Sequence, residues 1–176
     1  MPEKIQTLVA ALRERGIDYL TPTDAESDRP IDAKILIACL AGHADARLRQ
    51  ALIALFLFEP RLAKHVPLLR RKLNQKAARE LMAFYMAAVY LQRMWTIRLG
   101  RYLGPFAKLP TLFKKELRLP DPEEEYGKVG LIALAEWHQS VSSHRFNHLS
   151  EYQGVADLIF QSLKMKRRGH ESASKS

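Results

Sequence analysis

Apolar residues recur along most of the chain at the three- and four-residue spacing that marks one face of an α-helix. Residues 5–12 give the first such face, and Gly16 is a suitable end for that helix. The alternation of apolar and polar residues that marks a half-buried strand is absent, as are the Asn-Gly and Asp-Gly pairs of tight hairpins. The pattern therefore predicts an all-α fold, a single compact helical bundle of about six to eight helices.

Prolines, glycines and capping residues divide this pattern into elements. Pro30 suits the first turn of a second helix that ends near Gly42. Asp45 suits the N-cap of a third helix, which ends before Pro60. Two short helical pieces, split at Pro67, are expected to follow.

Residues 44–66 have the look of a HEAT-like helix pair: a charged start, an apolar helix, a proline turn and a second helix. No second copy follows at a period of about 35–45 residues, so a solenoid is not predicted. Residues 17–30 form the clearest loop, with a short capped turn expected at Thr23–Glu26.

The longest helix is predicted from about Asn74 to about Tyr102, roughly 40 Å at 1.5 Å per residue. Its middle, Leu81–Leu91, is uncharged and apolar on every side, which is typical of the central helix of a bundle. This apolar run is far shorter than the roughly 20 residues that cross a bilayer, so we expect no membrane contact.

Three further helices are predicted over residues 111–119, 122–139 and 151–168. Pro122 opens the second of them and places Glu123–Glu125 in its first turn, where carboxylates favour the positive end of a helix. The last helix leads into a polar tail, residues 169–176, which we expect to be disordered. Residues 1–168 are therefore predicted to form one domain.

Composition agrees with a folded domain that has a substantial core. The chain has 176 residues, of which 47% are hydrophobic and 27% are charged. Its first sixteen residues lack the cationic start, apolar middle and cleavage site of a signal peptide, so a cytoplasmic location is expected. The single cysteine, Cys39, lies in an apolar run and is interpreted as a small core residue.

The net charge of +9 is concentrated in the middle of the chain. Residues 33–118 contain seventeen Lys and Arg against four Asp and Glu, a net charge of +13. The flanking residues 1–32 and 119–162 carry −3 and −5, and the last fourteen residues carry +4. A basic block between acidic flanks suggests a face that attracts phosphate or an acidic protein.

Two basic clusters are the predicted partner-binding residues of this block. Lys76 and Arg79 lie at a helix N-terminus, where the helix dipole disfavours cations, and that small cost suggests a partner or an acidic neighbour. The clusters are Arg70, Arg71, Lys72, Lys76 and Arg79, and then Lys114, Lys115 and Arg118.

Nucleic acid is the alternative partner for the same clusters. Lysine and arginine neutralise phosphates, and exposed aromatic side chains can stack on bases. Tyr85, Tyr90, Trp95 and Tyr102 are near these charges in the sequence. Cations are also ordinary surface residues, so both alternatives remain open at this point.

The histidines are candidates for metal ligands. His138, His144 and His148 lie within eleven residues, near Glu136 and Glu151, and the last two histidines have the spacing of one helix turn. The residues around them suggest a loop, however, and the chain has no HExxH motif and no paired cysteines. We therefore predict surface histidines, no metal site and no cofactor.

No catalytic motif is found. The acidic run before residue 126 is interpreted as a helix start, and the chain has no phosphate-binding glycine loop and no GxSxG motif. Arg61 is too close to His65 for the arginine–histidine spacing of helical ribonucleases. The sequence therefore predicts a protein without enzymatic activity, with a histidine-based activity as a third alternative.

Three stretches carry a resemblance to known proteins: residues 31–60, the segment AAVYLQRMW and the segment DPEEEYGKVGLIALAE. They resemble small all-α bacterial proteins of toxin–antitoxin-like gene pairs, which have a nucleotidyltransferase-like partner. The resemblance implies a partner protein and no reaction. We therefore expect a cytoplasmic helical interaction protein whose basic middle face binds an acidic partner protein, or alternatively a regulator that binds nucleic acid.

Overall fold

Helices make up the regular structure of residues 5–20, 29–144 and 146–175, which the computed structural model describes. These residues contain no strand, and the predicted all-α fold with up to eight α-helices is confirmed. In chain order the elements are α1 (Ile5–Glu14), α2 (Ala33–Gly42), α3 (Ala46–Phe58), the 3-10 helix η1 (Pro60–His65), α4 (Val66–Lys72), α5 (Gln75–Met94), α6 (Thr96–Leu103), the 3-10 helix η2 (Glu124–Gly127), α7 (Lys128–Val141) and α8 (His148–Ser174).

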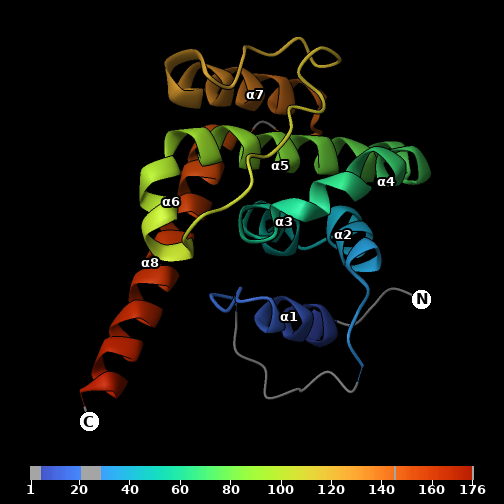
Figure 1. Ribbon diagram of the computed structural model, residues 1–176. Helices are drawn as coiled ribbons and strands as arrows, with labels where there is room; N and C mark the ends of the chain where they lie inside the picture. Colours follow the sequence, from blue (N-terminus) through green and yellow to red (C-terminus); the bar gives the residue numbers. More distant parts are fainter. Residues whose placement is uncertain (1–4, 21–28, 145, 176) are drawn as a thin grey trace.

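The central helix is α5, as the apolar run predicted. It packs against α2, α3, α4 and α7, and it lies between α7 on one side and α2 and α3 on the other (Figure 1). Every side chain from Leu81 to Leu91 is buried, because neighbouring helices cover α5 on each side. The hydrophobic core therefore forms around this one helix.

Polar N-caps set the starts of four helices. The side chain of Asp45 accepts a hydrogen bond from the amide of Arg47 at 2.9 Å, as predicted for the start of α3. Asn74 caps α5, Asn147 caps α8, and Asp32 caps α2. The second helix consequently begins after Asp32 and not at Pro30 or Ile31, the predicted starts.

The predicted helix over residues 74–102 is broken at Trp95 into α5 and α6. Trp95 has φ −115° and ψ 22°, and the hydroxyl of Thr96 donates to the carbonyl of Gln92 at 2.6 Å, an interaction that bends helices. The bend brings the rings of Trp95 and Tyr102 to 5.6 and 6.5 Å from that of Phe160 in α8. Packing against a distant helix therefore ends α5.

The segment after α6 returns past α5 to the level of α7 (Figure 1) and contains no α-helix. The prediction of a helix over residues 111–119 is wrong, because this stretch makes only turns. The amide of Leu119 bonds to the carbonyl of Lys114 at 2.9 Å, and Arg118 has the left-handed φ of 53°. A left-handed residue interrupts the regular helical bonding pattern.

The acidic run starts the short 3-10 helix η2 and not the longer helix that was predicted to begin at Pro122. Helix α7 begins at Lys128 and has no acidic residue in its first turn. Glu125 and Tyr126 have left-handed φ values of 44° and 55°, and Gly127 follows with 87°. A Cβ on Gly127 would lie 2.5 Å from the carbonyl oxygen of Tyr90, so the close approach of this turn to α5 requires glycine.

The C-terminal segment differs from the predicted disordered tail. Helix α8 continues through Ser174, although residues 169–174 are exposed. Arg167 and Glu171, one helix turn apart, form an ion pair at 3.6 Å that favours the extension.

The predicted turn at Thr23–Glu26 lies outside the described residues. Within the described part of the chain, no helix is both long and apolar enough to cross a membrane.

Candidate functional site

The first predicted basic cluster lies where α4 meets α5. Arg71 and Lys72 are exposed at the end of α4, and Lys76 and Arg79 follow in the first turns of α5, as predicted. None of these four has an ion pair with another described residue. Arg70 differs, because its guanidinium contacts the carboxylate of Glu116.

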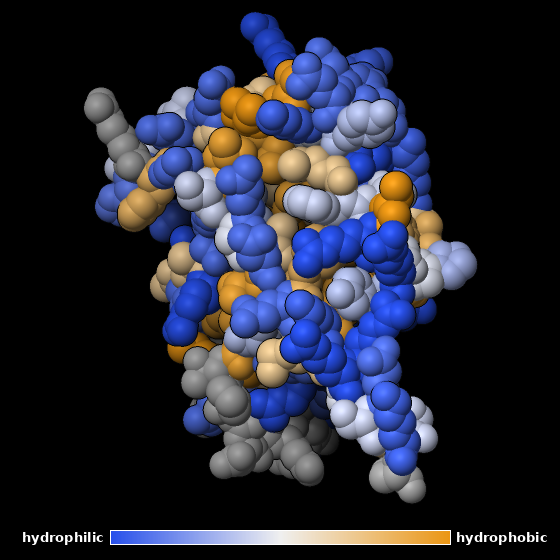
Figure 2. All heavy atoms as spheres, turned by 90° about the vertical axis from the view of Figure 1, so that its left-hand side faces the viewer, coloured by the Kyte–Doolittle hydropathy of each residue, from blue (hydrophilic) through white to orange (hydrophobic). Residues whose placement is uncertain are grey.

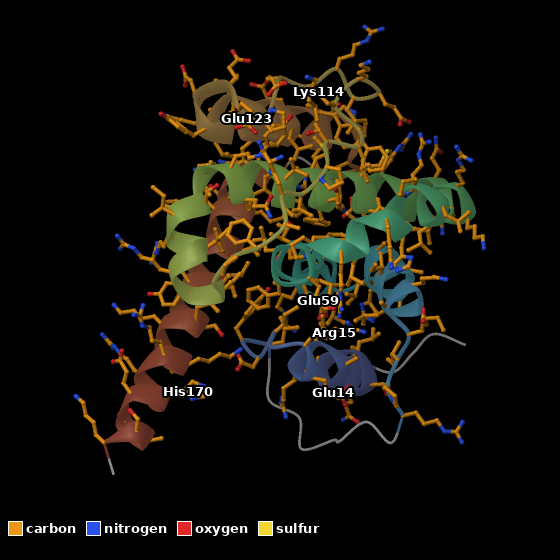
Figure 3. All side chains as sticks on the ribbon, viewed as in Figure 1. Glu14, Arg15, Glu59, Lys114, Glu123 and His170 are labelled. Carbon is orange, nitrogen blue, oxygen red and sulfur yellow. The ribbon has the colours of Figure 1, made fainter. Side chains whose placement is uncertain are left out.

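That contact brings the two predicted clusters together. Glu116 belongs to the turn that carries the second cluster, so Lys115 and Arg118 lie near the end of α4 and are exposed. Lys114, labelled in Figure 3, instead pairs with Asp121 at 2.8 Å. The ion pairs of Arg70 and Lys114 leave six of the eight predicted residues without an ion pair in the described structure.

An apolar groove between α2 and α4, with a volume of about 290 Å³, adjoins the first cluster. Ile35 and Leu68 line this α2–α4 groove and are 53% and 51% exposed. Lys34, Lys64 and Lys72 surround them, and none of the three has an ion pair with another described residue. The groove therefore combines exposed apolar side chains with positive charge.

His65 also lines the α2–α4 groove. Its pKa is lowered from the ordinary value, first by the partial loss of solvent and then by the charges of Lys64 and Lys34, against a smaller opposite effect of Asp32. The shift reflects the local excess of positive charge. Sequence reasoning missed this groove because Ile35 lies in an apolar run that predicted only core residues.

A larger open cleft, of about 1170 Å³, lies at the other end of α5. We call it the α6 cleft, because α6 and the segment that follows it form most of its lining. Aromatic and cationic side chains alternate along it, namely Trp95, Tyr102, Phe106 and Tyr126 among the first, and Arg98, Arg101, Lys108 and Arg167 among the second. Figure 2 shows this side of the molecule, where hydrophilic side chains surround scattered apolar surface.

Of the four aromatic residues that the sequence offered for stacking on bases, two are buried and two line the α6 cleft. Tyr85 and Tyr90 are fully buried, and their hydroxyls donate to the carbonyls of Pro110 and Pro120 at 2.6 and 2.8 Å. Trp95 and Tyr102 line the α6 cleft. Only this second pair is therefore available to a ligand.

A buried polar network joins α3, α5, α7 and α8. The prediction of surface histidines is wrong for His138 and His148, which are 1% and 7% exposed. Nε2 of His138 lies 2.9 Å from Glu80, and Nδ1 of His148 lies 2.5 Å from Glu151. The hydroxyl of Tyr152 lies 2.6 Å from the other ring nitrogen of His138. Each buried histidine therefore has a carboxylate of its own.

Both carboxylates remain acidic despite their burial. Burial raises the pKa of Glu80, but the hydrogen bond from His138 and the charge of Arg49 outweigh it, and the net pKa is below the ordinary value. The pKa of Glu151 is lowered in the same way: burial opposes the shift, and hydrogen bonds from His148 and Gln50 produce it. The network is thus held by ionised carboxylates.

His138, His148 and Glu151 also offer three ligand atoms within 4.8 Å of one another. The two imidazole rings are stacked, with centroids 3.7 Å apart and planes at 15°. A metal ion lies close to the plane of each imidazole that binds it, and one ion cannot lie in two parallel planes at this separation. The arrangement therefore favours a hydrogen-bonded network over a metal centre.

The side chain of His148 lies between those of Ser142 and Glu151, as the base lies between the nucleophile and the acid of a catalytic triad. Oγ of Ser142 lies 3.3 Å from Nε2 of His148. The hydroxyl donates its single hydrogen to the carbonyl of His138 at 2.7 Å, however, so it is not directed at the imidazole. This geometry favours a structural role for Ser142 over that of an activated nucleophile.

No family model, no curated protein and no solved structure matches this chain. The molecule itself is a helical bundle with a buried polar network and two cationic surfaces, the α2–α4 groove and the α6 cleft.

Proposed function

We propose that this chain is a helical interaction protein without enzymatic activity, and that it binds an acidic partner protein through the α2–α4 groove and the neighbouring basic cluster. The observation that carries the proposal is the pairing of exposed Ile35 and Leu68 with Lys34, Lys64 and Lys72 around one groove. Protein interfaces combine an apolar centre with a polar border, and this groove has both.

The occupant that fits is an amphipathic helix with acidic residues beside its apolar face. Such a helix would insert apolar side chains between Ile35 and Leu68, as helices do in hydrophobic grooves. Its carboxylates would meet the three lysines around the groove and, beyond them, Arg71 and Lys76. Complementary charges at the border of an interface mainly raise the association rate and select the partner.

The resemblance to proteins of toxin–antitoxin-like pairs supplies a candidate for this partner, a nucleotidyltransferase-like protein encoded beside this chain. In that case binding would act by covering a surface of the partner. The α2–α4 groove is separate from the histidine network, so this function requires no reaction at His138 or His148.

The test is a binding measurement between the purified chain and the product of the neighbouring gene. We expect one defined complex, and we expect Leu68→Asp to weaken it at least tenfold, because it places a carboxylate in the apolar centre. Lys64→Glu should lower the association rate more than it raises the dissociation rate.

Leu158→Asp is the matched control, since Leu158 is 43% exposed on α8, away from the groove. It should leave the affinity unchanged. The proposal fails if no complex forms, or if Leu68→Asp binds as tightly as the Leu158 control.

A further inference from the structure

We infer that the α6 cleft is a binding site for single-stranded nucleic acid. This site is separate from the α2–α4 groove and from the predicted basic clusters. The cleft combines positive charge, exposed aromatic rings and a strained turn that carries one of those rings.

The charge of the α6 cleft is strongly positive. Arg101 is exposed and has no ion pair with another described residue, and Arg98 has no carboxylate partner there either. Among the described residues of the lining, Glu123 is the single carboxylate, and it already pairs with Arg93 at 2.9 Å and with Lys108 at 2.6 Å. Free cations beside a neutralised carboxylate suit the phosphates of a polynucleotide.

Arg93 lines the cleft but is not available to a phosphate group. Its side chain is only 7% exposed, and it donates to the carbonyl of Leu109 and to the side chain of Gln92. It holds the segment after α6 against α5 and so shapes the cleft floor. Arg167 pairs with Glu171 at 3.6 Å, so the available charge is that of Arg98 and Arg101.

The aromatic rings supply surfaces on which bases can stack. Trp95 is 36% exposed at the break between α5 and α6, and Tyr126 is 81% exposed on η2. The guanidinium of Arg98 lies 4.0 Å from the ring centroid of Phe160, and that of Arg167 lies 5.8 Å from Tyr102. Stacked guanidinium groups and open rings are the surfaces that unpaired bases use.

The backbone that presents Tyr126 is strained. Glu125 and Tyr126 are consecutive residues in the left-handed region, which side chains other than glycine rarely adopt. The turn is fixed at Gly127, whose backbone touches Tyr90 of α5. The strained backbone therefore lies where the exposed ring of Tyr126 borders the α6 cleft.

These features favour an unpaired strand over a duplex. In a duplex the base faces are stacked on one another and cannot reach Trp95 or Tyr126. An acidic protein would satisfy the arginines but would leave the exposed rings without a planar partner. A single strand satisfies both, and the open cleft of about 1170 Å³ exceeds what an ordinary small ligand needs.

The experiment titrates the purified full chain with a labelled twelve-nucleotide oligomer as single-stranded RNA, single-stranded DNA or duplex DNA. We expect either single strand to bind at least tenfold more tightly than the duplex, and the ratio of RNA to DNA affinity to show whether the 2′-hydroxyl is read. Equal binding of duplex and single strand would overturn the proposal.

Two substitutions separate the cleft from general positive charge. Arg101→Gln should weaken single-strand binding several-fold and reduce the salt dependence by about one unit. Arg71→Gln removes the same charge at the end of α4 and should have little effect. Equal losses for the two variants would overturn the proposal, because they would indicate a diffuse electrostatic attraction.

The two tryptophans provide a direct readout of stacking. Binding should quench the fluorescence of Trp95, so the quench should persist in Trp137→Phe and disappear in Trp95→Phe, which keeps an aromatic ring against Phe160. Tyr126→Asn should reduce affinity about tenfold without unfolding the turn, since asparagine tolerates a left-handed φ. A quench that persists in Trp95→Phe would contradict the site.

Discussion

Glu80 and Glu151 each hold a buried imidazole ring in place, and their ionisation links folding to pH. Both have a pKa in the folded chain below the ordinary value of 4.5. A lowered pKa contributes stability that is complete above pH 4.5 and that is lost as the pH falls through the folded-state pKa.

We therefore expect Glu151→Gln to be less stable than the wild type at pH 7, because it weakens the bonds to His148 and Gln50. The difference in the free energy of unfolding should narrow as the pH falls below 4.5, since only the wild type then loses the ionised carboxylate. Urea denaturation between pH 3 and 7 measures this. Glu136→Gln, an exposed control on α7, should match the wild type throughout. If the difference in the free energy of unfolding between the wild type and Glu151→Gln stayed constant from pH 7 to pH 3, the linkage would be contradicted.

Two glycines in helices offer a second prediction about single residues. A Cβ on Gly130 would lie 1.9 Å from the ring of Tyr90, whose hydroxyl is fixed to the carbonyl of Pro120. Gly130→Ala should therefore destabilise the protein by about 2 kcal/mol or more, through overpacking. Gly154→Ala has no neighbour within 4 Å in α8 and should stabilise it by about 0.5–1 kcal/mol. Thermal unfolding distinguishes the two, and equal shifts would contradict the packing around Tyr90.

At the scale of single residues, the sequence could show the buried run of α5 but not the environment of the histidines. His138 falls on the buried side of α7, yet its partners Glu80 and Tyr152 come from two other helices. No local pattern brings those three together. The loop residues near His148 suggested exposure, and only the packing of α8 shows that the ring is covered.

Among the helices, α5 determines most of the architecture, and its start depends on one side chain. The side-chain oxygen Oδ1 of Asn74 accepts a hydrogen bond from the amide of Ala77 at 2.9 Å. Asn74→Ala should cost about 1 kcal/mol, and Asn74→Asp should retain the stability because it can still cap and carries a favourable charge at this helix end. Urea denaturation provides the test. If Asn74→Asp lost as much stability as Asn74→Ala, the loss of the N-cap would not explain the effect.

Helix boundaries that depend on local chemistry could be predicted, and those that depend on distant packing could not. Asp45 and Gly16 mark ends that the sequence signals directly. The break at Trp95 has no proline or glycine and depends on Phe160 of α8, far along the chain. The acidic run before α7 follows the rule for helix starts, but the close approach of Gly127 to α5 imposes a left-handed turn instead.

On the scale of the whole molecule, the two cationic surfaces lie at opposite ends of α5. Helix α4, which lines the α2–α4 groove, precedes α5, and α6 follows it (Figure 1). The twenty residues of α5 span about 30 Å, and the α2–α4 groove and the α6 cleft have no lining residue in common. The sequence predicted a basic middle block but not its division, because the charges are contiguous in the chain and α5 separates them in space.

This separation predicts that the two proposed ligands bind independently. Saturating the chain with the single-stranded oligomer should change its affinity for the neighbouring gene product less than twofold, since distant sites that share no residue contribute additively. Lys64→Glu should weaken only the protein complex, and Arg101→Gln only the oligomer complex. Isothermal titration of the partner, with and without the oligomer, measures both effects. Competition between the two ligands, or a variant that weakens both, would mean that one surface serves both and that α5 does not divide them.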